Sequence, residues 1–329
     1  MTAPTSVAAI VGTGARAEML VHLITRHGRK AVVWPAFDDL IEAKARERVR
    51  KRLGDCGAQL VNGPEQIADT SRTVFVVTPS WRLRSIANRL GGSLGGHHTV
   101  VHTCTGLEEG SHAPASDVLR AETPVRLVGA LVGPIHAAGH LLGKPGAAVV
   151  GSRFPSVIAA VQAALAGPMF RVYGNVDLTG VEVGGAVADV LAVAVGLADG
   201  LDLGASVRGT VFARGLAELE RIGAVFGATP GTLTGMAGLG YLAATTSAPI
   251  GVPMKIGRAL ASGKSMAEVL ARFPRDGREL VAACETVRDR TQARNVEAHI
   301  TGAIASVMVD GASPADAVRQ LLTLGQMME

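Results

Sequence analysis

The chain has 329 residues, of which 48% are hydrophobic and 18% are charged, and its formal net charge is +4. This composition excludes an intrinsically disordered chain, and the length favours two domains over one. The three cysteines are widely spaced and form no CxxC pair, which disfavours both a zinc site and a disulfide framework. We therefore expect no metal.

Basic residues gather in one short stretch, between positions 46 and 52. No aromatic residue accompanies them, so this stretch is better interpreted as the solvated face of a helix than as a nucleic-acid-binding patch. The N-terminal sequence enters an apolar strand without a basic leader region. No apolar run has the pattern that a membrane helix needs. We expect a cytoplasmic protein without a membrane span.

The first half of the sequence alternates short apolar runs with helical stretches. This rhythm predicts an α/β domain with a doubly wound parallel sheet. The expected strands cover residues 7–11, 31–34, 73–77, 99–102, 126–131 and 146–150, and the expected helices residues 15–27, 41–53 and 81–90.

After about residue 180 only helical patterns follow. They cover residues 184–200, 205–226, 265–271, 279–295, 300–310 and 313–324. Ser313 and Pro314 have the types expected at the N-cap and first turn of the last helix. We therefore predict a dinucleotide-binding domain at residues 1–179 and an all-helical domain, for substrate binding and dimerisation, at residues 180–329.

A dinucleotide-binding motif follows the first expected strand. Residues 12–17 read Gly12, Thr13, Gly14, Ala15, Arg16 and Ala17, which has the form GxGxxA. The first glycine permits a tight turn, the second lets the backbone approach a pyrophosphate, and the small Ala17 allows close packing of helix and strand. This motif predicts NAD or NADP as cofactor. Because no arginine directly follows the second strand, the sequence slightly favours NAD.

Several segments resemble the bacterial NAD(P)-dependent glycerol-3-phosphate dehydrogenases. The block from Gly196 to Gly240 matches that family almost position by position. Further matches are VGTGARAEML at the phosphate loop, VVTPSWRLRSI with Pro79 after the third strand, TGLEEG, VGPIHA and the segment Tyr173 to Ala186. The resemblance implies a Rossmann domain, a helical substrate domain, a small-molecule substrate and a homodimer.

The chain departs from that family at positions that the resemblance assigns to catalysis. Ala188 and Asp189 stand where the family has a lysine and an asparagine, and Thr105 stands where it has a second lysine. Tyr241 replaces an aspartate, and Val252–Pro253 replace the Arg–Asn pair that holds substrate phosphate. Removing one proton donor typically costs about 10²–10⁴-fold in rate. Losing a guanidinium also removes a strong, charge-assisted grip on phosphate.

Other residues of the resemblance remain, or offer replacement chemistry. Thr245, Arg214, Glu182 and Glu285 are retained, and the resemblance places Glu285 near the cofactor. Tyr241, His136 and Asp189 are candidate catalytic acid–base groups, and Thr105, Thr245 and Lys255 are candidate substrate-binding residues. Each also has a structural interpretation, as a hydrogen-bonded wall residue, an ion-paired group or a solvated side chain.

The sequence leaves three functions open. The preferred one is hydride transfer between nicotinamide and a carbonyl, imine or hydroxyl group of a substrate other than glycerol 3-phosphate. The second is a non-catalytic descendant that keeps nucleotide binding. The third is a genuine glycerol-3-phosphate dehydrogenase whose site residues have been misaligned.

Overall fold

The computed structural model describes residues 7–36, 42–247 and 251–323. The chain divides into two compact units, one formed by Met1–Cys104 and Pro114–Leu178 and the other by Thr105–Ala113 and Thr179–Glu329. We call them the sheet unit and the helical unit. The segment 105–113, which lies inside the domain expected at residues 1–179, groups with the helical unit instead.

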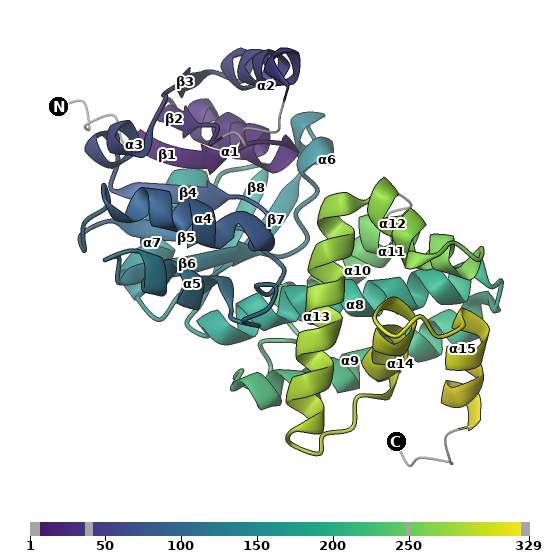
Figure 1. The fold of residues 1–329 in the computed structure, drawn as a ribbon. Helices are drawn as coiled ribbons and strands as arrows, with labels where there is room; N and C mark the ends of the chain where they lie inside the picture. Colours follow the sequence, from purple (N-terminus) through teal and green to yellow (C-terminus); the bar gives the residue numbers. More distant parts are fainter. Residues whose placement is uncertain (1–6, 37–41, 248–250, 324–329) are drawn as a thin grey trace. The chain divides into compact units, whose positions relative to one another are not determined.

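The described part of the sheet unit contains one sheet of eight strands in the order β3-β2-β1-β4-β5-β6-β7-β8 (Figure 1). The strands are β1 Val7–Gly12, β2 Lys30–Trp34, β3 Ala58–Leu60, β4 Thr73–Val77, β5 Thr99–His102, β6 Leu127–Val132, β7 Gly146–Gly151 and β8 Phe170–Asn175. All neighbours pair in parallel except β6 and β7, whose pairing is antiparallel. The expected Rossmann sheet is thus confirmed, with one antiparallel pair added.

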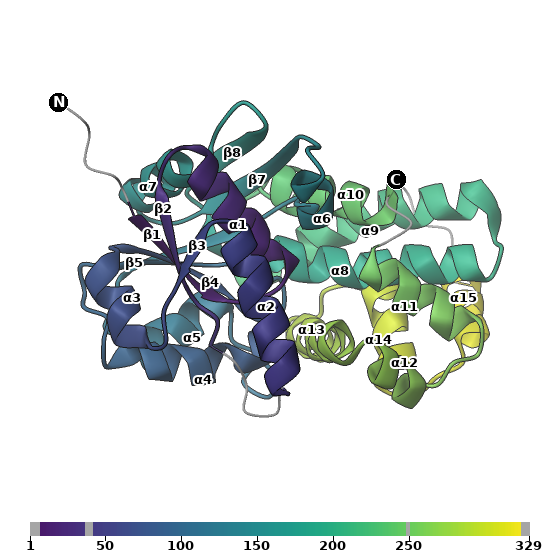
Figure 2. The ribbon, with the colours of Figure 1, turned by 90° about the horizontal axis from the view of Figure 1, so that it is seen from above.

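Helices cover both faces of this sheet. They are α1 Ala15–Arg26, α2 Ala43–Asp55, α3 Pro64–Thr70, α4 Ser80–Gly91, α5 Ala115–Glu122, α6 Ala137–Leu141 and α7 Pro155–Leu165. Helices α1, α6 and α7 lie on one face, and α3, α4 and α5 lie on the other (Figure 2). Strand residues such as Ile10 and Phe75 are fully buried beneath α1, which is why the strands read as continuous apolar runs.

The helical unit is built around α8, Leu178–Gly200. The other elements are α9 Gly204–Phe226, the π-helical turn η1 Met236–Gly240, α10 Tyr241–Ser247, α11 Val252–Ala261, α12 Met266–Arg272, α13 Pro274–Gln292, α14 His299–Met308 and α15 Pro314–Thr323. Among the described residues, α8 alone is long and apolar enough to cross a membrane, but 94% of its most apolar window is buried in the structure. The burial identifies α8 as the core helix of this unit.

Glycines bring α8 and α11 into close contact. A Cβ atom on Gly196 would lie 2.4 Å from the carbonyl oxygen of Met254, and one on Gly257 would lie 2.2 Å from that of Val193. Backbones that approach this closely leave no room for a side chain at either position. The contact fixes the N-terminal half of α11 against the C-terminal half of α8.

Candidate functional site

The turn between β1 and α1 has the geometry of a phosphate-binding loop. Gly12 adopts a φ of 123°, and a Cβ there would lie 1.9 Å from the carbonyl oxygen of Val77 on β4. Gly14 has a φ of 96° and is the N-cap of α1, with no side chain capping the helix. The first amides of α1 are therefore left to bind a ligand, and the helix dipole favours an anion there.

The position of this loop in the sheet supports the same function. Strand β1 lies between β2 and β4, at the point where the strand order changes direction. Ligands of doubly wound sheets bind at this point, beyond the carboxyl ends of the strands. Ala17 is fully buried against the sheet, whereas Ala15 is exposed at the loop. These residues fit a dinucleotide.

Two further predicted cofactor residues lie at neighbouring strand ends. The Arg16 guanidinium donates through Nη1 to the carbonyl oxygen of Thr103, just after β5, at 2.5 Å. Pro79 is the N-cap residue of α4, after β4. The Cys104 thiol donates to the carbonyl oxygen of Thr78 at 3.1 Å, which ties the ends of β4 and β5 together. The structure thus brings Arg16 and Pro79 to the carboxyl edge of the sheet.

The end of β2 has an unusual backbone. Ala36 has a left-handed φ of 46°, and its carbonyl oxygen accepts a hydrogen bond from Nη2 of Arg82 at 3.2 Å. Phe37, Asp38 and Asp39, which continue the chain after β2 and contain no arginine, lie outside the described residues. Arg82 was not identified from the sequence as a site residue.

His136 belongs to the sheet unit. It is exposed and forms the N-cap of α6. Its ring packs closely against Gly139: a Cβ atom placed on this glycine would lie 2.4 Å from Nδ1 of the His136 ring. The other two candidate catalytic residues, Asp189 and Tyr241, belong to the helical unit.

Asp189 and Tyr241 come from elements that pack together. Asp189 is half-buried on α8, next to the fully buried Ala188. Earlier on α8, a Cβ on Gly184 would lie 3.1 Å from the carbonyl oxygen of Ala237, in the turn that precedes Tyr241. Tyr241 opens α10 and packs, half-buried, against the helical core.

Thr245 and Lys255 lie around the start of α11. Thr245 is one helical turn after Tyr241 and therefore shares its face of α10. A Cβ on Gly251, the N-cap of α11, would lie 2.4 Å from the Thr245 carbonyl oxygen. Lys255 follows one turn later; it is half-buried, and its ammonium group makes no ion pair within the described residues. Two of the three predicted substrate residues, Thr245 and Lys255, thus lie near the N-terminal end of α11.

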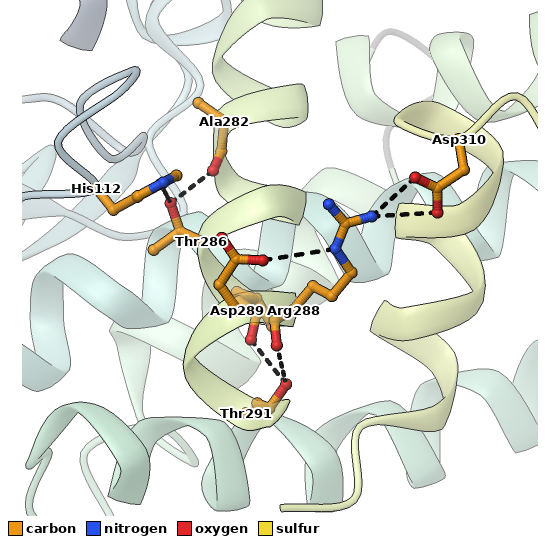
Figure 3. Close-up of polar contacts among 8 residues, drawn as sticks. His112, Ala282, Thr286, Arg288, Asp289, Thr291 and Asp310 are labelled. Carbon is orange, nitrogen blue, oxygen red and sulfur yellow. Dashed lines mark hydrogen bonds and ion pairs between the residues drawn. The ribbon is translucent and has the colours of Figure 1, made fainter. Parts of the chain in front are cut away.

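The third, Thr105, opens the segment 105–113, which is tied to α13. Arg278 on α13 forms an ion pair with Glu109 at 2.7 Å. The Thr286 hydroxyl donates to the carbonyl oxygen of Ala282 at 2.7 Å and accepts from Nδ1 of His112 at 2.5 Å (Figure 3). A hydroxyl has a single proton, which Thr286 donates to Ala282, so its oxygen accepts the hydrogen bond from His112.

Glu285, the predicted cofactor residue, adjoins Thr286 on α13 and is half-buried. Nothing in the sequence links His112 to Thr286, since 174 positions separate them. No group of three or more His, Cys, Asp or Glu side chains that could hold a metal ion occurs in the described ranges.

Comparison with known proteins decides the family. Residues 7–157 match the model of the NAD-dependent glycerol-3-phosphate dehydrogenase N-terminus, and residues 177–319 match that of the C-terminus. The chain belongs to the NAD-dependent glycerol-3-phosphate dehydrogenase family. It is therefore an NAD(P)-dependent, dehydrogenase-like oxidoreductase.

Relatives match over most of the chain. A glycerol-3-phosphate dehydrogenase, NAD(P)+, of Cupriavidus pinatubonensis is 39% identical over 260 residues, which cover 77% of this chain and 75% of the relative. One of Paucimonas lemoignei is 33% identical over 331 residues and covers 95% of each chain. The crystal structure of the Coxiella burnetii enzyme of the same name superposes with a TM-score of 0.87 at 26% identity, covering 97% of this chain and all of that one.

Proposed function

We propose that this protein transfers a hydride between the nicotinamide of NAD(P) and a carbon that bears a hydroxyl or carbonyl group. The observation that carries the proposal is the glycine turn of residues 12–14 at the uncapped start of α1, located where the strand order changes direction. The backbone amides of this turn would hold the pyrophosphate, and Pro79 would lie beside it at the same edge of the sheet. Glu285 is proposed as a cofactor residue from the family resemblance.

The substrate pair that the comparisons favour is glycerol 3-phosphate and dihydroxyacetone phosphate, because relatives with that activity in their name match nearly the whole chain. The helical unit offers a place for the phosphate. Lys255 and the N-terminus of α11 both attract an anion, and Thr245 with its hydroxyl lies beside the same helix start. The sequence alone favoured a substrate other than glycerol 3-phosphate, so this proposal reverses that preference.

A substrate without a terminal phosphate is the second candidate, and the side chains of α8 and α11 favour it. The fully buried Ala188 cannot donate a proton, and Val252 and Pro253 cannot grip a phosphate. In either case Tyr241, Asp189 or His136 would supply the proton that accompanies the hydride. If none of these side chains supplies the proton, the protein binds nucleotide without catalysing hydride transfer.

The test measures oxidation of NADPH and NADH by the purified chain with dihydroxyacetone phosphate and with phosphate-free ketones. We expect turnover with dihydroxyacetone phosphate. Lys255→Ala should raise KM by about tenfold or more, because one charge-assisted contact is lost. Lys264→Ala is the matched control, since Lys264 is an exposed lysine of the same unit paired with Glu268. Tyr241→Phe should lower kcat by about 10²-fold if Tyr241 is the proton donor.

Two results would contradict parts of this account. Turnover only with phosphate-free ketones, unaffected by Lys255→Ala, would establish the second candidate. Nucleotide binding without any turnover would establish the non-catalytic one.

We also propose, from the family resemblance, that the protein works as a cytoplasmic homodimer. Sedimentation of the purified chain can test whether it forms a dimer.

A further inference from the structure

We propose that Arg16 makes the protein bind the reduced cofactor more tightly than the oxidised one, because its guanidinium places a positive charge in the nicotinamide half of the dinucleotide site. The inference rests on the proposed cofactor site and adds a selectivity that the glycine turn does not provide. The turn binds the pyrophosphate, which is the same in both forms of the cofactor.

The side chain of Arg16 extends from the end of β1 to the end of β5. Arg16 lies in the first turn of α1, directly after the Gly12–Gly14 turn, and its Nη1 donates to the carbonyl oxygen of Thr103 at 2.5 Å. Strand β4 lies between β1 and β5, so the side chain crosses the carboxyl end of β4. The guanidinium therefore lies at the carboxyl edge of β4 and β5.

The hydrogen bond holds the guanidinium at a fixed point and leaves its charge unpaired. Thr103 is buried, and its amide donates to the carbonyl oxygen of Val76 on β4 at 3.1 Å. Arg16 makes no other hydrogen bond and no ion pair within the part of the chain that the structure describes. The next acid along α1, Glu18, pairs instead with Arg52 on α2 at 3.0 Å. No paired carboxylate therefore neutralises Arg16 among these residues.

The edge of β4 and β5 is the nicotinamide side of a Rossmann sheet. Such a sheet binds the two mononucleotide halves on the two sides of its switch point, and the adenosine ribose meets the end of the second strand. The nicotinamide half then lies on the other side, which here is formed by β4, β5 and β6. The bond to Thr103 ties the Arg16 guanidinium to this side.

The two forms of the cofactor differ by one unit charge on the nicotinamide ring. The oxidised ring is a cation, the reduced ring is neutral, and the ADP-ribose part is identical in both. A guanidinium is always charged, and Arg16 is half-buried, which makes its field less screened than that of a solvated arginine. Arg16 therefore repels the oxidised ring and not the reduced one, while its attraction for the pyrophosphate is common to both.

Arg26 provides a matched control on the same helix. It is an exposed residue in the last turn of α1, ten positions and about 15 Å along the helix from Arg16. Arg26→Gln removes the same charge from α1 without changing the carboxyl edge of the sheet. An effect of net charge alone would appear equally in Arg16→Gln and Arg26→Gln.

The experiment titrates the full-length chain and its Arg16→Gln, Arg16→Lys and Arg26→Gln variants with NADH, NAD+, NADPH, NADP+ and ADP-ribose by calorimetry. We expect the wild type to bind each reduced cofactor more tightly than its oxidised form. The ratio of the oxidised to the reduced Kd should fall by about fivefold or more in Arg16→Gln, because a repulsion between two charges is removed. Arg16→Lys keeps the charge and should keep the ratio, as should Arg26→Gln.

ADP-ribose separates this effect from a general loss of affinity. It contains the pyrophosphate but no nicotinamide, so it measures any contribution of Arg16 to pyrophosphate binding. That contribution changes the affinities for the reduced and the oxidised cofactor by the same factor and leaves their ratio unchanged. Binding of ADP-ribose by a variant also shows that its nucleotide site is folded.

The inference is overturned if the wild type binds the oxidised cofactor as tightly as the reduced one. It is also overturned if Arg16→Gln weakens both forms and ADP-ribose by the same factor, or if Arg26→Gln lowers the ratio as much as Arg16→Gln does. Because binding alone is measured, these results are independent of turnover. Failure of the wild type to bind any of the dinucleotides would instead contradict the proposed function itself.

Discussion

At the scale of single residues, His140 shows how the sheet unit depends on a buried neutral imidazole. The side chain is almost fully buried on α6, its Nδ1 lies 3.1 Å from the carbonyl oxygen of Lys144, and its ring contacts Phe170 edge-on. Burial lowers the pKa of His140, and the charge of Arg26 lowers it further, against the opposing effect of the Lys144 carbonyl. The folded protein therefore holds His140 in its neutral form.

This lowered pKa predicts a loss of stability in mild acid. In the unfolded chain His140 has an ordinary pKa and takes up a proton more readily than in the folded chain, so the free energy of unfolding should fall as the pH drops below about 6.5. Denaturant unfolding at a series of pH values between neutral and mildly acidic measures this fall in the free energy of unfolding. His140→Phe, which cannot titrate, should show a shallower decline than the wild type. An equal decline in both proteins would contradict the assignment to His140.

Residue-scale reasoning from sequence found the phosphate loop but missed Arg82. The glycines at 12 and 14 are recognisable because only glycine tolerates that backbone, and the spacing itself carries the information. The hydrogen bond from Arg82 to the Ala36 carbonyl oxygen joins residues 46 positions apart across β1, which no local pattern encodes. Asp189, Tyr241 and Lys255 were found only through the family resemblance.

At the scale of elements, the segment 105–113 is attached to α13 by side-chain contacts. His112 has a left-handed φ of 57°, and its imidazole donates to Thr286 on that helix. The Glu109–Arg278 ion pair is exposed and contributes little by itself. The contact of His112 with the buried Thr286 hydroxyl therefore helps to hold the segment that carries Thr105.

Thr286→Val should remove this contact while preserving the shape of the side chain. We expect a loss of about 1 kcal/mol in stability and faster hydrogen exchange of the amides of residues 105–113. The matched control is Thr291→Val, because the buried Thr291 hydroxyl donates to the Val287 carbonyl oxygen within α13 and does not contact the segment (Figure 3). Equal exchange in the two variants would show that the segment is held by other contacts.

Most strands and helices were predictable because each bears a repeating apolar pattern. Strands β4 and β5 fall on the predicted residues, 73–77 and 99–102. Several elements were not among those predicted: β3 and β8, the helices α3, α5, α6 and α7 of the sheet unit, and η1, α10 and α11 around the candidate anion site. The turn η1 packs against α8 at Gly184, and α11 packs against it at Gly196 and Gly257, so close approach at glycines positions these two elements.

At the scale of the whole molecule, the predicted boundary near residue 180 lies close to the division after Leu178. The transfer of residues 105–113 to the helical unit was not predictable, because it depends on contacts with α13 that lie far along the sequence. The sheet unit holds the phosphate loop and His136, and the helical unit holds Asp189, Tyr241 and Lys255.

The central claim is that hydride passes between nicotinamide and the substrate carbon. The most direct measurement supplies the reduced cofactor with deuterium at both hydrogen positions of C4 of the nicotinamide, together with dihydroxyacetone phosphate, and locates the deuterium in the product by mass spectrometry. The account predicts glycerol 3-phosphate carrying one deuterium on C2, the carbon with the new hydroxyl group. Cofactor bound by the protein with no deuterium transferred to product would contradict it.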